Sequence, residues 1–288
     1  MELSPFPVEI ITLYSILCKF AIGFSTLCMN EFIDTHSHLY DAAFDEDFDQ
    51  AVSRARKQGV VKCIFPAIDS SSYEAMAGRS DALPDFAFPC IGLHPTSVAD
   101  NWEEEMTFVR SKIKERKFYA VGEIGIDEYW SKDFLPQQKR VFAEQIELAA
   151  EYNLPIIIHS REATEDIFNT LEETKGIPVK GTFHAFSGSY ETYKRILTFG
   201  DFKIGIGGVL TYKNAGIASV LEKMSMDDIV LETDCPWLTP APFRGKRNES
   251  SYIATIAEKV SQIKNVPLHD VALKTTCSAQ QLFNLHDS

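Results

Sequence analysis

The stretch Phe32-Ile33-Asp34-Thr35-His36-Ser37-His38 begins with apolar residues and ends in two histidines. Four later stretches have the same form, and each ends in a histidine or a carboxylate: Ala120-Val121-Gly122-Glu123, Ile156-Ile157-Ile158-His159, Gly181-Thr182-Phe183-His184 and Ile229-Val230-Leu231-Glu232-Thr233-Asp234. All strands of a parallel barrel end at one face, so side chains that are distant in sequence meet there. The sequence therefore predicts an α/β barrel with a cluster of metal-binding groups at one mouth.

From Phe32 onward, short apolar stretches alternate with stretches of helical periodicity. We expect eight strands, over Phe32–His38, Val61–Ile68, Phe86–His94, Tyr119–Asp127, Pro155–Ser160, Gly181–Phe186, Phe202–Gly208 and Asp228–Asp234. We expect one of the intervening helices over Gln137–Tyr152, and two closing C-terminal helices over Ser250–Ile263 and Leu268–Leu285. Eight strands, each followed by a helix, predict a (β/α)8 TIM barrel. A doubly wound open sheet is the alternative, but it would gather ligands from fewer strands.

The first 29 residues differ from the rest of the chain. Ile10–Phe24 is largely apolar, but Glu2 and Glu9 stand where a signal peptide is positively charged, and Lys19 interrupts the run. We expect residues 1–29 to be an extra segment outside the barrel, with Met29 as the functional start and residues 30–288 as one barrel domain. A membrane or targeting role for the segment is the alternative.

Composition narrows the class of protein. The net charge of −13 argues against a protein that binds duplex DNA over a broad basic surface. A polyanionic substrate would have to be bound by metal ions and a few local cations. The six cysteines include no C-x-x-C pair, which indicates reduced thiols rather than a disulfide framework. We expect a cytoplasmic monomer without a stable membrane partner.

Six side chains are the candidate metal ligands: His36, His38, Glu123, His159, His184 and Asp234. In a strand, residues i and i+2 point to the same face, so the H-x-H pair is expected to aim two imidazoles at one point. Glu123 is costly to bury unless it is paired or coordinated, and its two oxygens can bridge two ions. Such a set can bind two divalent cations, and its mixed donors leave Mg, Mn and Zn open.

The two carboxylates in this set, Glu123 and Asp234, are also candidate catalytic groups. Asp234 can accept the proton of an activated water, and Glu123 can bridge the ions. Glu232 shares the face of Asp234 by strand alternation and is expected to orient a ligand.

Substrate contacts are expected from His94, Arg161, Arg244 and Arg247. His94 follows the third predicted strand and suits a substrate contact or a proton shuttle. Arg161 comes shortly after His159, and Arg244, Lys246 and Arg247 form a basic loop after the eighth strand, where they could clamp a phosphate. A purely structural His94 and a solvated basic loop are the alternatives.

Several sequence blocks in this order resemble the TatD family of metal-dependent deoxyribonucleases within the amidohydrolase-like barrels, and most closely its YjjV-type branch. The blocks are FIDTHSHL, GLHP, AVGEIGID, PIIIHSR, HAFSG, IGIGG, LETDCPWLTP and RGKRNE, and the match runs from Phe32 to about Leu285. One departure is Ser278, which stands where the family usually has Asn. The resemblance implies a (β/α)8 barrel that binds two divalent ions and cleaves DNA. It also implies that His36, His38, Glu123 and Asp234 hold one ion, and that Glu123, His159 and His184 hold the other.

The leading hypothesis is therefore a metal-dependent hydrolase that cleaves phosphodiester bonds in DNA, trimming single strands or 3′ ends. Two alternatives stay open at this point. One is an amidohydrolase-like enzyme acting on a small amide, lactone or phosphate ester. The other is a metal-binding protein without turnover.

Overall fold

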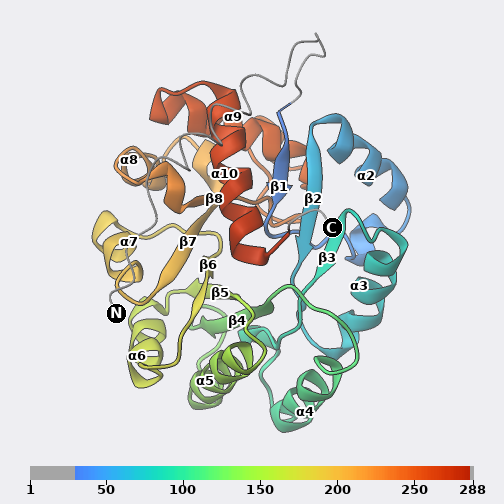
Figure 1. The fold of residues 1–288 in the computed structure, drawn as a ribbon, viewed down its shortest axis with the longest axis vertical. Helices are drawn as coiled ribbons and strands as arrows, with labels where there is room; N and C mark the ends of the chain where they lie inside the picture. Colours follow the sequence, from blue (N-terminus) through green and yellow to red (C-terminus); the bar gives the residue numbers. More distant parts are fainter. Residues whose placement is uncertain (1–29, 286–288) are drawn as a thin grey trace, which may run out of the picture.

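The computed structural model describes residues 30–285, so the prediction for residues 1–29 lies outside the described part of the chain. Eight parallel strands alternate with helices within that part (Figure 1). The strands are β1 (Phe32–Asp34), β2 (Val60–Phe65), β3 (Ala87–Pro89), β4 (Val121–Asp127), β5 (Ile156–Arg161), β6 (Lys180–Phe183), β7 (Asp201–Ile206) and β8 (Ile229–Leu231). The predicted (β/α)8 barrel is confirmed.

The strands lie in chain order around the barrel, and their hydrogen-bonded ladders form two sheets. One sheet has the order β1-β2-β3, and the other has the order β4-β5-β6-β7-β8. Isolated parallel bridges cross the two seams between them, Ile91 with Val121 and Ser37 with Cys235. At the β8–β1 seam, the backbone N–H of Thr35 also donates to the carbonyl of Leu231 over 3.0 Å. The doubly wound open sheet is therefore excluded.

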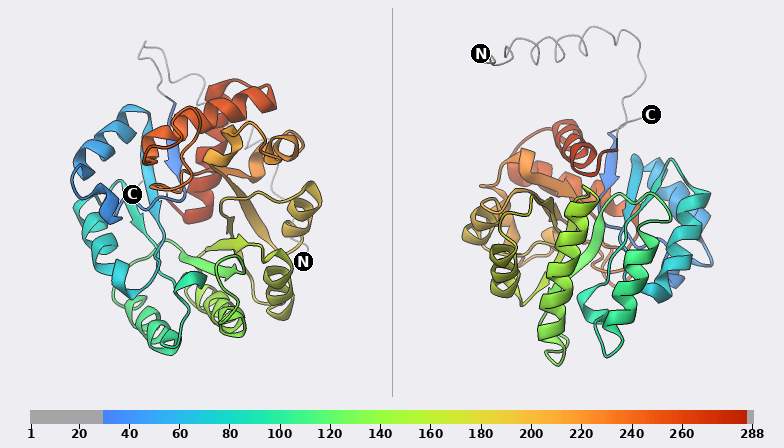
Figure 2. Two further views of the ribbon diagram at one scale, coloured as in Figure 1. Left: turned by 180° about the vertical axis from the view of Figure 1, so that it is seen from behind. Right: turned by 60° about the horizontal axis from the view of Figure 1, so that its bottom comes forward.

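The helices form the outer layer of the molecule (Figures 1 and 2). They are α2 (Phe48–Lys57), α3 (Ser70–Ala82), α4 (Trp102–Lys112), α5 (Leu135–Glu151), α6 (Thr164–Glu173), α7 (Tyr190–Ile196), α8 (Ile217–Leu221), α9 (Ile253–Lys264) and α10 (Leu268–Phe283). Short 3-10 helices lie in the connections, at Ala42–Phe44, Pro95–Ser97, Gly208–Thr211, Met226–Asp228 and Ser250–Tyr252.

The intervening helix predicted over Gln137–Tyr152 is α5, which begins two residues earlier at Leu135. Pro136 stands in its first turn, where the missing N–H costs no helical hydrogen bond. Val141, Ile146, Leu148 and Ala149, which define the apolar face in the sequence, are all buried. The periodicity therefore identified both the helix and the side that packs against the barrel.

The last helix, α10, closes one end of the barrel. Leu282 and Phe283 belong to a buried cluster with Ile33, Ile157 and Val230, which come from three different strands. The ribbon shows α10 lying across the centre of the barrel (Figure 1). Because this end is filled with apolar side chains, a site for a polar substrate has to lie at the opposite end, beyond the carboxyl ends of the strands.

Most strands are shorter than predicted, and two of the differences affect the site. β1 ends at Asp34 rather than at His38, and β8 ends at Leu231 rather than at Asp234. The chain continues in loops that are polar in sequence but still largely buried, as Thr35–His38 shows. The two closing helices are present, although the first is preceded by a 3-10 turn and begins at Ile253.

Two further observations concern the class of protein. No helix within residues 30–285 is long and apolar enough to cross a membrane. The four cysteines in this part of the chain, Cys63, Cys90, Cys235 and Cys277, are free thiols. Cys18 and Cys28 lie outside the described residues.

Candidate metal centre

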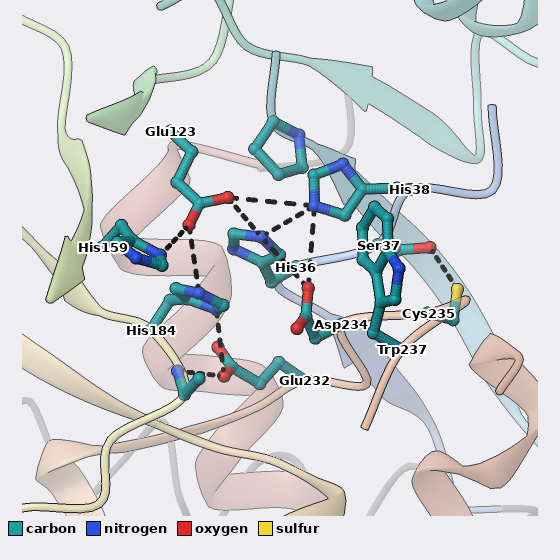
Figure 3. A network of polar contacts seen from close by, with 12 residues as sticks. His36, Ser37, His38, Glu123, His159, His184, Glu232, Asp234, Cys235 and Trp237 are labelled. Atoms are coloured by element: carbon teal, nitrogen blue, oxygen red, sulfur yellow. Dashed lines mark hydrogen bonds and ion pairs between the residues drawn. The ribbon is translucent and has the colours of Figure 1, made fainter. Parts of the chain in front are cut away.

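The six predicted ligand residues meet around the carboxylate of Glu123 at the carboxyl ends of the strands (Figure 3). Oε2 of Glu123 lies 3.0 Å from Nε2 of His36 and 3.8 Å from Nε2 of His38. Its other oxygen, Oε1, lies 2.9 Å from Nδ1 of His159 and 3.1 Å from Nε2 of His184. Each oxygen of one buried carboxylate thus faces its own pair of imidazoles.

Asp234 completes the group on the side of His36 and His38. Its Oδ1 lies 3.7 Å from Nε2 of His36 and 3.6 Å from Nε2 of His38. Ligand atoms of three sets lie within 4.8 Å of one another: His36, His38 and Asp234; His36, Glu123 and His184; and His94, Glu123 and His159. Imidazole nitrogens and carboxylate oxygens at this spacing suit divalent transition metals.

Loop hydrogen bonds, rather than strand alternation, hold the H-x-H pair. Since β1 ends at Asp34, the prediction that both histidines lie on one face of a strand is wrong. The N–H of His38 donates to the carbonyl of Cys235 over 2.9 Å, and the N–H of Asp234 donates to the carbonyl of His36 over 2.9 Å. Asp234 itself has φ of 57°, a left-handed conformation that Asp tolerates better than most residues. These bonds bring the ends of β1 and β8 together.

Tyr40 fixes the tautomer of His38. The Tyr40 hydroxyl has one proton, and it donates that proton to the carbonyl of Pro66 over 2.5 Å. It must therefore accept the hydrogen bond from Nδ1 of His38, which lies 2.7 Å away. Nε2 of His38 is left with a free lone pair directed at Nε2 of His36, 3.0 Å away. Two such nitrogens face each other favourably only with a proton or a cation between them.

Asp127 fixes the tautomer of His159, and this role was not predicted from the sequence. Its Oδ2 lies 2.9 Å from Nε2 of His159 and accepts a hydrogen bond from it, which leaves the lone pair on Nδ1 directed at Glu123. Such outer carboxylates orient metal-bound histidines and raise their basicity. Asp127 is four residues after Glu123 on β4, so strand alternation, which places both on one face, was the signal that could have identified it.

Glu232 lies behind His184, as expected of an orienting group. Its Oε1 is 3.5 Å from Nδ1 of His184 and accepts the backbone N–H of Ala185 over 2.5 Å. The carboxylate is fully buried, and Gly205 leaves room for it: a Cβ at Gly205 would come within 2.2 Å of Oε2. Gly205 is therefore required by the position of Glu232.

His94 has the opposite tautomer from His38. The backbone N–H of Thr96 donates to Nδ1 of His94 over 3.1 Å, so a neutral ring carries its proton on Nε2. This Nε2 lies 3.4 Å from Oε1 of Glu123. His94 lies within ligand spacing of Glu123 and His159, but this tautomer makes it a hydrogen-bond donor to Glu123 at the edge of the cluster.

Burial and charge set the protonation of the two central carboxylates. Burial by itself would raise the pKa of Glu123, but the imidazoles of His184, His36 and His94 outweigh it and hold that pKa well below its ordinary value. Burial raises the pKa of Asp234 to about 8; His184 opposes the shift, and the charge of Glu123 adds to it. A cation between them would favour the ionised form of both carboxylates. The donor set therefore fits divalent metal.

The three predicted arginines are all engaged with other side chains. The guanidinium of Arg161 lies 3.8 Å from the ring centre of Tyr129, and that of Arg244 lies 4.3 Å from the ring centre of Tyr212. Arg247 forms a two-pronged ion pair with Asp47, at 2.7 and 2.9 Å. This pairing leaves Arg247 a smaller part in binding a phosphate than its sequence position suggests.

Comparisons with known proteins agree with this geometry. The model of a family described as TatD related DNase matches residues 33–284. An uncharacterized metal-dependent hydrolase of Bacillus subtilis, YabD, is 37% identical over 254 residues, which span 88% of this chain and 99% of the relative. Another from Escherichia coli, YjjV, is 29% identical over 257 residues, or 88% of this chain and 98% of the relative.

Solved structures give the same picture. The crystal structure of Escherichia coli YjjV, described as a TatD homolog, superposes with a TM-score of 0.83 at 27% identity, covering 89% of this chain and 99% of that one. A TatD family hydrolase from Entamoeba histolytica superposes with a TM-score of 0.76 at 23% identity over 89% of this chain and 99% of the other, which supports the fold alone.

Proposed function

This chain belongs to the TatD related DNase family and is a metal-dependent hydrolase, and from that premise we propose that it hydrolyses phosphodiester bonds in DNA, removing nucleotides from the end of a single strand. The observation that carries the proposal is the position of Glu123. Its two oxygens face two separate sets of imidazoles, which is the arrangement expected of a carboxylate shared by two cations.

We assign the cluster to two divalent cations, Mg, Mn or Zn. His36, His38, Asp234 and Oε2 of Glu123 would hold one, and His159, His184 and Oε1 of Glu123 would hold the other. When bound, such cations supply Lewis acidity, which acidifies water and stabilises the negative charge that develops on a phosphate. The tautomers fixed by Tyr40 and Asp127 support this assignment, because each leaves a lone pair on the inner nitrogen.

The remaining steps belong to side chains of the protein. Asp234 is the group to accept a proton from the attacking water, since its carboxylate lies beside the His36 and His38 side chains that would hold an ion, and a cation there would keep it ionised. His94 presents an N–H at Nε2 next to Glu123. That N–H can donate a hydrogen bond to a phosphate oxygen and stabilise the negative charge that develops on it. Asp234 would thus act as the base, and His94 as a hydrogen-bond donor to the phosphate.

A single strand suits the surroundings of the site. Trp237 is 48% exposed, and its ring centre lies 5.1 Å from that of His38 (Figure 3). An exposed indole beside the cluster can stack on an unpaired base of any sequence. Phe243 is less suited to this role because it already stacks on Tyr252, with 4.3 Å between ring centres.

The alternative enzyme, acting on a small amide, lactone or phosphate ester, has weaker support. Barrels of that kind bridge their metals with a carboxylated lysine, and here Glu123 is the side chain placed between the two sets of imidazoles. The alternative of a metal-binding protein without turnover would require loss of the water-activating carboxylate, and Asp234 is present.

Metal analysis combined with a nuclease assay tests the proposal. Purified protein loaded with Mg, Mn or Zn should release mononucleotides from single-stranded DNA, and Glu123→Ala should lose both bound metal and activity. Glu115→Ala removes an exposed carboxylate from the surface and is the matched control. Thermal unfolding of each variant separates loss of the site from loss of the fold. Wild-type protein that holds metal but leaves single-stranded DNA intact with all three ions would contradict the proposal.

A further inference from the structure

Two neighbouring aromatic side chains on the loop after β4 are exposed. Tyr129 is 49% exposed and Trp130 is 68% exposed, although large apolar side chains are otherwise mostly covered in the described part of the chain. The guanidinium of Arg161 lies over both rings, 3.8 Å from the centre of Tyr129 and 5.3 Å from that of Trp130. A flat cation against aromatic faces restricts how the rings can turn.

The same loop is tied to the metal centre by one side chain. Oδ1 of Asp127 accepts the backbone N–H groups of Tyr129 and Trp130, over 2.9 and 3.1 Å. Oδ2 of Asp127 accepts the hydrogen bond from His159. Asp127 thus fixes the exposed aromatic rings relative to an inner histidine of the cluster.

A cavity of about 230 Å³ opens beside Trp130. Trp130 and Phe134 line one part of it and Pro95, Thr96 and Val98 another, while Asp127 and Gln138 add polar atoms. Since a water molecule occupies about 30 Å³ of liquid, a cavity of this volume has room for at least one planar ring system. The cavity on the other side of the cluster, next to Glu232 and Asp234, measures only about 10 Å³ and is too small for a ring.

We propose that this cavity binds the nucleobase of the terminal nucleotide, with the base stacked on Trp130. The proposal rests on the proposed function, because it places the scissile phosphate on the Glu123 cluster. The terminal nucleotide is the occupant because an enzyme that removes nucleotides from an end has to hold the departing residue next to the scissile phosphate, and Asp127 joins the cavity wall to His159 of the cluster. Thr96, which follows His94 closely, lies on the cavity wall, so one short segment contacts both the base and the reacting end of the site.

Stacking on an aromatic ring requires a base but depends little on which of the four bases is present. The enzyme should therefore accept all four terminal bases but should distinguish a nucleotide from an abasic residue. Alanine substitution of a stacking ring typically weakens binding roughly 5- to 150-fold per base. Because Trp130 is mostly exposed, its replacement should leave the fold intact.

The first experiment compares two single-stranded thymidylate oligonucleotides, one with ordinary ends and one with an abasic residue at both ends. Trp130→Ala should raise KM for ordinary ends by about ten-fold or more, with little change in kcat, and should leave cleavage of the abasic ends unchanged. Trp130→Phe keeps an aromatic face and should stay close to wild type. Ala99→Trp, which fills the cavity from its wall, should reproduce the loss seen in Trp130→Ala.

A binding measurement makes the test independent of turnover. Titration calorimetry of dTMP and of deoxyribose 5-phosphate should show tighter binding of dTMP to wild type, and Trp130→Ala should remove the difference. If the base adds nothing to binding, or if Trp130→Ala lowers cleavage of ordinary and abasic ends equally, the base pocket is overturned. If base-dependent binding is present but no strand is cut, the pocket stands and the proposed function fails.

Discussion

Thr96 donates its backbone N–H to Nδ1 of His94 over 3.1 Å, with its hydroxyl 2.6 Å from the same nitrogen, and this gives His94 a different role from the four other imidazoles of the cluster. It forces the ring proton onto Nε2, the nitrogen that faces Glu123. His159, by contrast, donates a hydrogen bond from Nε2 to Asp127 and directs the lone pair on Nδ1 toward Glu123. Two histidines that look alike in the sequence are thereby prepared for donation in one case and for coordination in the other.

We expect His94→Ala to keep its bound metal but to lose most of its turnover, about 10²- to 10³-fold if its N–H stabilises the developing charge. His159→Ala should lose metal as well as turnover. Elemental analysis of both purified variants, alongside kcat on single-stranded DNA, distinguishes the roles. Loss of metal from His94→Ala would show that the ring is a ligand after all.

Replacement of Asp127 tests whether the outer hydrogen bond strengthens metal binding. In Asp127→Asn the amide can turn an N–H₂ toward Nε2 of His159, where a carboxylate oxygen accepts in the wild type. We expect metal affinity to fall roughly 10- to 100-fold. Competition with a metal-binding dye measures this directly. Asp133→Asn alters an exposed carboxylate of the same loop and should leave the affinity unchanged.

The lack of room for a side chain at Gly205 predicts how a substitution there would change the stability of the protein. A Cβ there would come within 2.2 Å of Oε2 of Glu232, a buried group that cannot move aside easily. Gly205→Ala should therefore cost about 1–3 kcal/mol in the free energy of unfolding. Gly216→Ala is the control, because a Cβ at Gly216 meets no heavy atom within 4 Å. Urea unfolding of both variants gives the comparison, and equal stabilities would show that the Glu232 side chain has freedom that its contacts do not suggest.

The ion pair between Asp47 and Arg247 predicts a pH dependence of stability. The hydrogen bond from Arg247 is the main cause that holds the pKa of Asp47 well below its ordinary value; burial opposes it and Arg54 adds to it. A depressed pKa in the folded state stabilises the protein above the unfolded value of about 3.9, and the gain disappears as the pH falls below it toward the folded value.

Asp47→Asn should therefore be less stable than wild type near neutral pH, by about 0.2–1 kcal/mol for a partly exposed pair. The difference should shrink as the solution is acidified below about pH 4. Denaturant titrations of metal-free protein at several pH values measure it. A difference that persists at low pH would mean that Asp47 acts through its shape rather than its charge.

Much of this architecture could be predicted from the sequence, because apolar stretches that each end in a histidine or a carboxylate form a simple pattern. The closed barrel and the gathering of His36, His38, Glu123, His159, His184 and Asp234 followed from that pattern. The ends of β1 and β8 were misjudged because the segments after them are held by hydrogen bonds across the seam rather than by a strand ladder, and no local pattern distinguishes the two.

What the sequence did not show is the hydrogen bonding behind the cluster. The pairing of His38 with Tyr40 depends on where the Pro66 carbonyl lies, and Arg247 turns to Asp47, which is 200 positions away along the chain. Such partners are chosen by the three-dimensional packing, and no local pattern marks them.

The two seams of the barrel have a consequence for how the protein holds together. His36 and His38 follow the strand sheet β1-β2-β3, whereas Glu123, His159, His184 and Asp234 belong to the sheet β4–β8 or follow its strands. Any ion shared by these groups would link one sheet of the barrel to the other. Loading with metal should then slow amide hydrogen exchange most at the two seams, between β3 and β4 and between β8 and β1.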